Sequence, residues 1–125
     1  MLIAKTRWFA RWARRERLTD AVLRSAVDEM RRGLVDAVLG KGLVKKRVAR
    51  VGGGKSGGFR TLLATNMHDR WVFVYGFAKS ERESIEDRQL QDLQRLARAY
   101  LSLSETETRR LLEAGVIQEA TGDQP

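Results

Sequence analysis

The stretch RWVFVYGFA, Arg70 to Ala78, decides the fold of this 125-residue chain. Aromatic and β-branched residues favour extended backbone, and successive side chains of a strand point to opposite faces of its sheet. Here both sets are apolar, because Trp71, Phe73, Tyr75 and Phe77 alternate with Val72, Val74, Gly76 and Ala78. A strand that is apolar on both faces lies inside a covered sheet. We therefore expect residues 70–78 to form a central strand.

Two earlier runs also have the composition of strands. They read LVKKRVAR (residues 43–50) and FRTLLAT (residues 59–65), and a glycine-rich link separates them. The tetrapeptide NMHD at residues 66–69 predicts a hairpin turn, which would join the second run to the central strand in antiparallel fashion. Residues 2–5 predict a further short strand at the start of the chain.

The N-terminal part of the chain has a helical period. Trp8, Phe9, Trp12 and Ala13 predict a first helix. A second helix is expected to begin at an N-cap, Thr19 or Asp20, and to end at Gly40. Its apolar stripe consists of Leu23, Ala26, Val27, Met30, Leu34, Ala37 and Val38.

Helical spacing returns after Lys79. The stripe of a third helix consists of Leu90, Leu93, Leu96, Ala97, Tyr100 and Leu101. Ser84 or Ser80 is the expected cap of this helix, and Ser104 with Glu107 forms a capping box for a fourth helix that stops at Gly115. The layout predicts an α+β fold with one domain over residues 1–125: a small twisted antiparallel sheet packed by two N-terminal helices and the C-terminal helices. Residues from about 116 to 125 are expected to be a tail.

The two tryptophans of the first helix allow two interpretations. Trp8 and Trp12 lie one helical turn apart, so an exposed pair would offer a stacking platform for nucleic-acid bases. The same spacing favours packing of both rings against the sheet, and this is the interpretation that we prefer.

Charge is unevenly distributed in this chain, whose formal net charge is +8. Residues 41–80 contain nine basic side chains and one acid, Asp69, whereas residues 81–125 contain ten acids and six bases. A basic middle region is typical of a protein that binds a polyanion such as nucleic acid. The alternative is that the charge only keeps the protein soluble.

The segment ARVGGGKSGGFR, residues 49–60, resembles a nucleotide-binding loop only superficially. Such a loop needs a helix directly after it, because the helix N-terminus binds the phosphates. Here Gly57 and Gly58 follow Ser56, and two glycines would cost the first turn of a helix about 2 kcal/mol relative to alanine. We interpret the segment as a link that brings the basic residues of two strands together and lets a nucleic-acid backbone approach closely.

Few residues are available for acid–base or metal chemistry. The chain has no cysteine and one histidine, His68, in the expected turn. It therefore has neither a cysteine zinc site nor a pair of histidines for RNA cleavage, and the basic region holds no carboxylate cluster. Lysine and arginine, which it has in excess, can stabilise the charge that develops during phosphoryl transfer.

Neither a signal peptide nor a membrane span is evident. Only four apolar residues precede Lys5, whereas the apolar core of a signal peptide needs roughly 7–15 residues. No run approaches the roughly 20 apolar residues of a membrane-spanning helix. We expect a cytoplasmic protein that does not enter a membrane.

Two blocks of sequence resemble the RelE/HigB-type toxins of bacterial type II toxin–antitoxin systems. They are GLVKKRVAR with GKSGGFRTLL (residues 42–63) and FVYGFAKSERESI (residues 73–85). The resemblance implies a RelE-like fold and an mRNA endoribonuclease that enters the ribosomal A site, where the 2′-hydroxyl of the RNA attacks the adjacent phosphate without a metal or other cofactor. It also implies a cognate antitoxin, usually a helix-turn-helix protein from the same operon, through which alone the complex would contact operator DNA.

The resemblance also suggests roles for individual residues. Lys45 and Lys46 match the family's strand lysines, Arg60 matches the arginine that holds the scissile phosphate, and Lys79 and Arg82 match basic residues near the end of the last strand. Tyr75 or Phe77 would stack on a base. Tyr75 or Lys46 would have to act as general base, since Phe77 stands where many relatives have a tyrosine or histidine. The remaining RNA-binding candidates are Arg47, Arg50 and Lys55.

Two other functions stay open at this stage. A gyrase inhibitor of the ParE type would share the fold and lack the cationic residues of the ribonucleases. A non-catalytic regulator that binds nucleic acid would keep the charge, but it would have no effect on growth.

Overall fold

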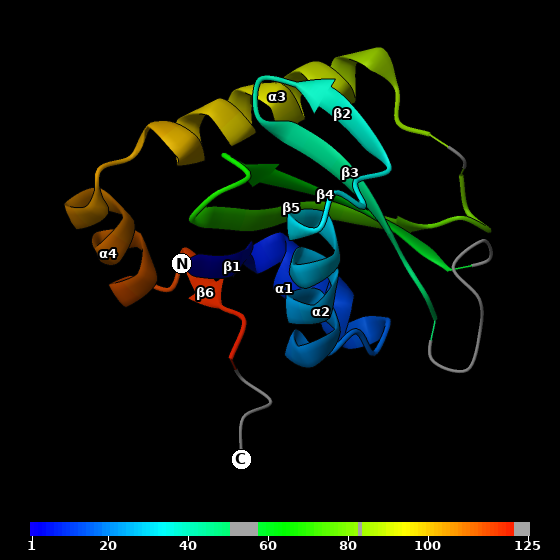
Figure 1. Cartoon of the computed structure of the whole chain (residues 1–125), viewed down its shortest axis with the longest axis horizontal. Helices are drawn as coiled ribbons and strands as arrows, with labels where there is room; N and C mark the ends of the chain where they lie inside the picture. The colour runs from blue at the N-terminus through cyan, green and yellow to red at the C-terminus, as the bar shows by residue number, and fades with distance from the viewer. Residues whose placement is uncertain (51–57, 83, 122–125) are drawn as a thin grey trace.

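The computed structural model of the chain describes residues 1–50, 58–82 and 84–121 (Figure 1). Over these residues six strands form one sheet, in the order β2-β3-β4-β5-β1-β6. The strands are β1 (Leu2–Thr6), β2 (Ala37–Gly40), β3 (Leu43–Val48), β4 (Phe59–Thr65), β5 (Arg70–Ala78) and β6 (Ile117–Glu119). The helices are α1 (Arg7–Arg15), α2 (Asp20–Arg31), α3 (Asp87–Ser102) and α4 (Glu105–Glu113). The expected α+β fold is confirmed.

Strand β5 lies inside the sheet, as its sequence predicts. It pairs with β4 in antiparallel fashion through the predicted turn at residues 66–69, and with β1 in parallel fashion. Seven of its nine residues are buried, and the other two, Arg70 and Tyr75, are partly buried. The β1–β5 pair makes the sheet mixed rather than wholly antiparallel, because the crossover through α1, α2 and the β2–β3–β4 strands returns the chain in the same direction.

A register shift breaks the strict alternation that the sequence of β5 suggests. Leu62 lies opposite Tyr75 and Leu63 lies opposite Phe73, so Val74 is an extra residue on β5. Such a bulge changes the side to which the following side chains point. Trp71 and Phe73 therefore belong to the core under α1 and α2, whereas Tyr75 and Phe77 belong to the core under α3 and α4.

The second helix is shorter than the apolar stripe suggests. Thr19 is its N-cap, as predicted, and its hydroxyl accepts a hydrogen bond from the Val22 amide at 3.3 Å. The helix ends at Arg31, because Gly33 adopts a left-handed backbone with φ of 94°, a conformation that commonly ends helices. The prediction of a helix up to Gly40 is wrong, since Ala37–Gly40 forms β2 and pairs with β3.

The C-terminal helices confirm one cap and correct another. Ser104 and Glu107 form the predicted capping box, and α4 ends just before Gly115, whose φ is 74°. Helix α3 is preceded by Glu86, which makes no side-chain cap, so the expected caps Ser84 and Ser80 are wrong. Ile117–Glu119 pairs with β1 as strand β6, although a tail was expected from about residue 116. Residues 122–125 lie outside the described part.

Both tryptophans pack against the sheet, as we preferred, but Trp12 is buried and Trp8 stays partly exposed. Trp12 is 4% exposed, and a Cβ atom added at Gly76 would meet its ring at 2.3 Å. Glycine at position 76 therefore makes room for the Trp12 ring. Trp8 is 39% exposed and stacks on Tyr75, with 4.6 Å between the ring centroids.

The helices cover the two faces of the sheet unequally. Helices α1 and α2 lie on one face and α3 crosses the other (Figure 1). Leu43, Leu62 and Ala64 pack in the core under α3. Lys45, Arg47 and Arg60 follow on the same face, because residues directly opposite one another on paired strands point to the same side and Lys45 lies opposite Leu62, Arg47 opposite Arg60. In the described part, no helix has the length and apolar character needed to cross a bilayer.

Candidate functional site

Basic side chains from two neighbouring strands and from the end of a third meet in a shallow cavity of about 430 Å³. Lys45 and Arg47 come from β3, Arg60 from β4, and Lys79 directly follows β5. Among the described residues, Asp36, in the link between α2 and β2, is the one carboxylate that lines it. Four cations against one anion make this cavity, called the cationic pocket below, suited to an anionic ligand.

Arg60 has the least ordinary environment in the cationic pocket. It is 8% exposed, and its Nη1 atom is buried without a hydrogen-bond partner in the described structure. Leaving a buried charged donor unpaired costs more than the roughly 1–3 kcal/mol of a neutral group. An anionic oxygen in the pocket would remove this penalty, so Arg60 is prepared to bind one.

Asp36 is held by Arg47 through two contacts. The Arg47 amide donates to Oδ2 at 2.7 Å, and the Arg47 side chain donates from Nε to Oδ1 at 2.9 Å. Partial burial tends to raise the pKa of Asp36, but these hydrogen bonds and the charges of Lys46 and Arg47 outweigh it, so the pKa lies below the ordinary 3.8. Asp36 is therefore ionised at neutral pH, and it fixes the orientation of Arg47.

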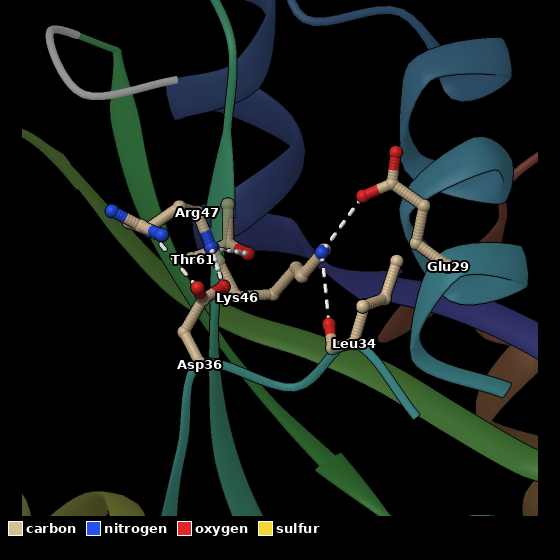
Figure 2. A network of polar contacts seen from close by, with 6 residues as sticks. All are labelled: Glu29, Leu34, Asp36, Lys46, Arg47 and Thr61. Carbon is tan, nitrogen blue, oxygen red and sulfur yellow. Dashed lines mark hydrogen bonds and ion pairs between the residues drawn. The ribbon is translucent and has the colours of Figure 1, made fainter. Parts of the chain in front are cut away.

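Lys46, which was expected at the site, does not line the cationic pocket. Its Nζ atom contacts Glu29 Oε1 at 2.7 Å and donates to the Leu34 carbonyl at 2.9 Å, and its side chain is 4% exposed. Figure 2 shows Lys46 reaching towards α2 while Arg47 turns to Asp36 on the other side. Adjacent residues of a strand point to opposite faces, so Lys46 and Arg47 cannot serve one pocket. Lys46 is also unsuited as a general base, because Glu29 holds its ammonium group.

The candidates near the end of β5 lie beside the pocket rather than in it. The guanidinium of Arg82 lies over the Phe77 ring, 5.8 Å from its centroid, and donates to Gln89 Oε1 at 3.0 Å. Phe77 is only 4% exposed, which leaves little of its ring for a base. Tyr75 lines a different cavity next to Trp8 and not the cationic pocket. It is therefore poorly placed to act as a general base on an RNA bound in that pocket.

Neither of the last two RNA-binding candidates, Arg50 and Lys55, is among the described residues that line the cationic pocket. Arg50 is exposed, with its guanidinium 4.8 Å from the centroid of Phe59, whose side chain belongs to the core under α1 and α2. Lys55 lies outside the described residues. The structure thus brings together four of the expected cations, namely Lys45, Arg47, Arg60 and Lys79.

Sequence reasoning missed Asp36. The residue was expected within the second helix, where its side chain would not have been linked to the pocket. The signal that could have indicated a break is Gly33, three residues earlier. Among the described residues, no group of three or more histidine, aspartate or glutamate side chains lies close enough together to hold a metal ion.

Comparison with known families agrees with this geometry. A family model described as the RelE toxin of the RelE/RelB toxin–antitoxin system matches residues 1–120. The chain belongs to the RelE toxin family. It is thus the toxin of a toxin–antitoxin system, and this membership implies an antitoxin as its partner. Searches of the curated proteins and of the solved structures gave no significant match to this toxin.

Proposed function

We propose that this toxin is an mRNA endoribonuclease that acts in the ribosomal A site and needs no metal ion. The observation that carries the proposal is the buried, unpartnered Nη1 of Arg60 in a pocket with three other cations. A phosphodiester is the anion in mRNA that such a pocket would bind. Family membership supports the proposal, because RelE toxins are generally enzymes that cleave mRNA.

The proposed reaction is an attack of the 2′-hydroxyl on the adjacent phosphorus. The O2′–P bond forms while the P–O5′ bond breaks, which leaves a cyclic phosphate on one fragment and a 5′-hydroxyl on the other. Negative charge builds up on the non-bridging oxygens in the transition state. Arg60 would bind one of these oxygens, and Arg47 and Lys45 on the neighbouring strand would add positive charge beside it. Fixed donors of this kind stabilise the transition state without reorganisation.

Proton transfer is the step for which the pocket is least equipped. Tyr75 lies in another cavity and Lys46 is paired with Glu29. Among the described residues that line the pocket, Lys45, Lys79 and Asp36 can exchange a proton. We assign the proton that the leaving 5′-oxygen takes up to Lys79, which is exposed where β5 ends. The proton that the 2′-hydroxyl loses would pass to solvent water in the open pocket. Charge stabilisation would supply most of the rate enhancement.

Induced expression followed by mapping of mRNA 5′ ends tests the proposal. Wild-type toxin should arrest growth and produce new cuts in translated reading frames, and Arg60→Ala should abolish both while the protein stays folded. Arg98→Ala removes an exposed arginine on α3 that does not line the pocket, so it should cut like the wild type. Incubation of the purified toxin with the same RNA, with and without ribosomes, shows whether cleavage depends on the ribosome.

Two outcomes would contradict the proposal. Growth arrest without new mRNA ends would favour inhibition of gyrase by the same fold. Binding of RNA by the wild type without any cleavage or growth defect would favour a regulator, and Arg60→Ala would then weaken binding gradually and make it less sensitive to salt.

A further inference from the structure

A second cavity, of about 450 Å³, lies between the start of α1 and the side of α3. Its walls are mainly apolar or aromatic: Trp8, Val74, Tyr75, Leu93, Leu96 and Tyr100. We call it the α1–α3 groove. Burial raises the pKa of the Tyr100 phenol above its ordinary 10.0, which agrees with an apolar environment. In the part of the chain that the structure describes, the groove shares no lining residue with the cationic pocket.

Two large apolar side chains are exposed in the α1–α3 groove. Trp8 is 39% exposed and Leu96 is 36% exposed. The Trp8 ring lies nearly parallel to that of Tyr75, with 22° between the planes, so its position is already fixed. Ordered aromatic side chains of this kind are typical anchors of protein interfaces. The groove is therefore prepared to bury an apolar partner.

Nucleic acid is a poor occupant of this groove. Arg7 is the one cation among the described residues that line it. Its guanidinium already donates to the Gly115 carbonyl at 2.8 Å and to the Ala114 carbonyl at 3.1 Å. Binding of RNA depends on several cations that are available to phosphates. The described lining of the groove offers none beyond Arg7, whereas four cations line the cationic pocket.

The charge around the groove indicates what kind of protein segment would fit. Helix α1 reads RWFARWARR and contains four arginines and no acidic residue. Arg11 is exposed and follows Trp8 by three positions, so the two side chains are neighbours on the helix surface. On the α3 side Asp92 is paired with Arg95 at 2.8 Å, which leaves that wall nearly neutral. A complementary segment would carry apolar residues flanked by acids on the α1 side.

We propose that the α1–α3 groove is a docking site for the antitoxin. An amphipathic segment would place apolar side chains against Trp8 and Leu96 and an acidic side chain near Arg11. The inference rests on membership of the RelE toxin family, which implies the antitoxin, and not on ribonuclease activity. The antitoxin would hold the toxin at a surface separate from the Arg60 pocket.

Titration of the purified toxin with the small protein encoded by the reading frame beside its gene tests this docking site. Leu96→Asp and Arg11→Glu place negative charge at the groove, so each should weaken binding by about tenfold or more. Val38→Asp is the matched control, because Val38 is 78% exposed on edge strand β2 and does not line the groove. It should bind within about twofold of the wild type, as substitutions outside an interface usually do. Circular dichroism of each variant checks that the fold is kept.

The result can be separated from the fate of the proposed ribonuclease, because binding is measured without RNA. The proposal is overturned if the neighbouring protein fails to bind the wild type, or if both groove variants bind it as tightly as the control does. It is also overturned if Leu96→Asp abolishes a dimer of the toxin seen by ultracentrifugation, or impairs RNA cleavage while antitoxin binding persists. The groove would then serve a second copy or the RNA.

Discussion

Lys46 and Arg60 are both more than nine-tenths buried, and they differ in what surrounds their charge. Lys46 has Glu29 and a carbonyl within hydrogen-bond distance, whereas Arg60 has a buried nitrogen with no partner in the described structure. The two lie on neighbouring strands, one on each face of the sheet. A buried charge needs a partner, so the paired cation serves the fold, and we propose that the unpaired one binds the ligand.

The largest effect should come from Arg60→Ala on RNA cleavage. Loss of one preorganised donor to a developing negative charge slows related reactions by about 10²–10³-fold, and we expect a loss in this range. Lys46→Ala, measured per folded molecule, should cleave within about threefold of the wild type. Single-turnover rates on programmed ribosomes give both numbers, and equal losses for the two variants would remove the distinction between them.

The next largest effect should be that of Lys46→Met on stability. The change removes the ammonium group that contacts the Leu34 carbonyl and the Glu29 carboxylate. The Glu29 side chain is 23% exposed. We expect the free energy of unfolding to fall by about 1–3 kcal/mol, less than for a fully buried pair. Lys45→Met is the matched control on the other face and should change it by less than about 0.5 kcal/mol. Urea denaturation of the three proteins measures this, and similar values for both variants would contradict it.

Arg60→Met should raise the free energy of unfolding, whereas Lys46→Met should lower it. Methionine replaces a buried guanidinium whose Nη1 is unpaired, so the free energy of unfolding should rise by about 1 kcal/mol. Thermal unfolding in buffer without phosphate or RNA is the suitable measurement. A clear loss of stability would mean that Arg60 is needed for folding, and the comparison with Lys46 would fail.

The smallest effect should come from Asp36→Asn. The Asp36–Arg47 pair is largely exposed on the arginine side, at 46%, so the loss of stability at pH 7 should be under about 1 kcal/mol. Because folding lowers the pKa of Asp36 below 3.8, this contribution is present in full above that pH. It is lost as the pH falls through the lower pKa of the folded state. Unfolding curves of both proteins between pH 7 and pH 2 should converge at the acid end.

The sequence predicted the parts of the fold that strong local patterns specify. The two apolar faces of residues 70–78, the turn at residues 66–69 and the capping box at Ser104 each depend on a few neighbouring residues. Strands β2 and β6 were missed because they have four and three residues at the two edges of the sheet. Their conformation depends on pairing with β3 and β1, which no local pattern reveals. The bulge at Val74 likewise depends on the register with β4.

The candidate site was predicted only in part, for a similar reason. Lys45, Arg47, Arg60 and Lys79 meet as expected, because the strand pairing was expected. Lys46 was included since it matches a family lysine, although period-two alternation places it on the other face from Lys45 and Arg47. Asp36 enters the site only because the chain leaves the helix at Gly33 and returns as β2. Contacts of this kind require the tertiary structure.

The position of β1 in the sheet has a consequence for folding. Leu2 lies beside Arg70 and Ala4 lies beside Glu119, so this strand meets its neighbours only across long stretches of chain. Closing such large loops costs entropy before any contact repays it, and contacts that are distant along the chain slow folding. Strand β1, which is synthesised before the other strands, should therefore be among the last to pair. Until it pairs, one edge of strand β5 stays open to other chains.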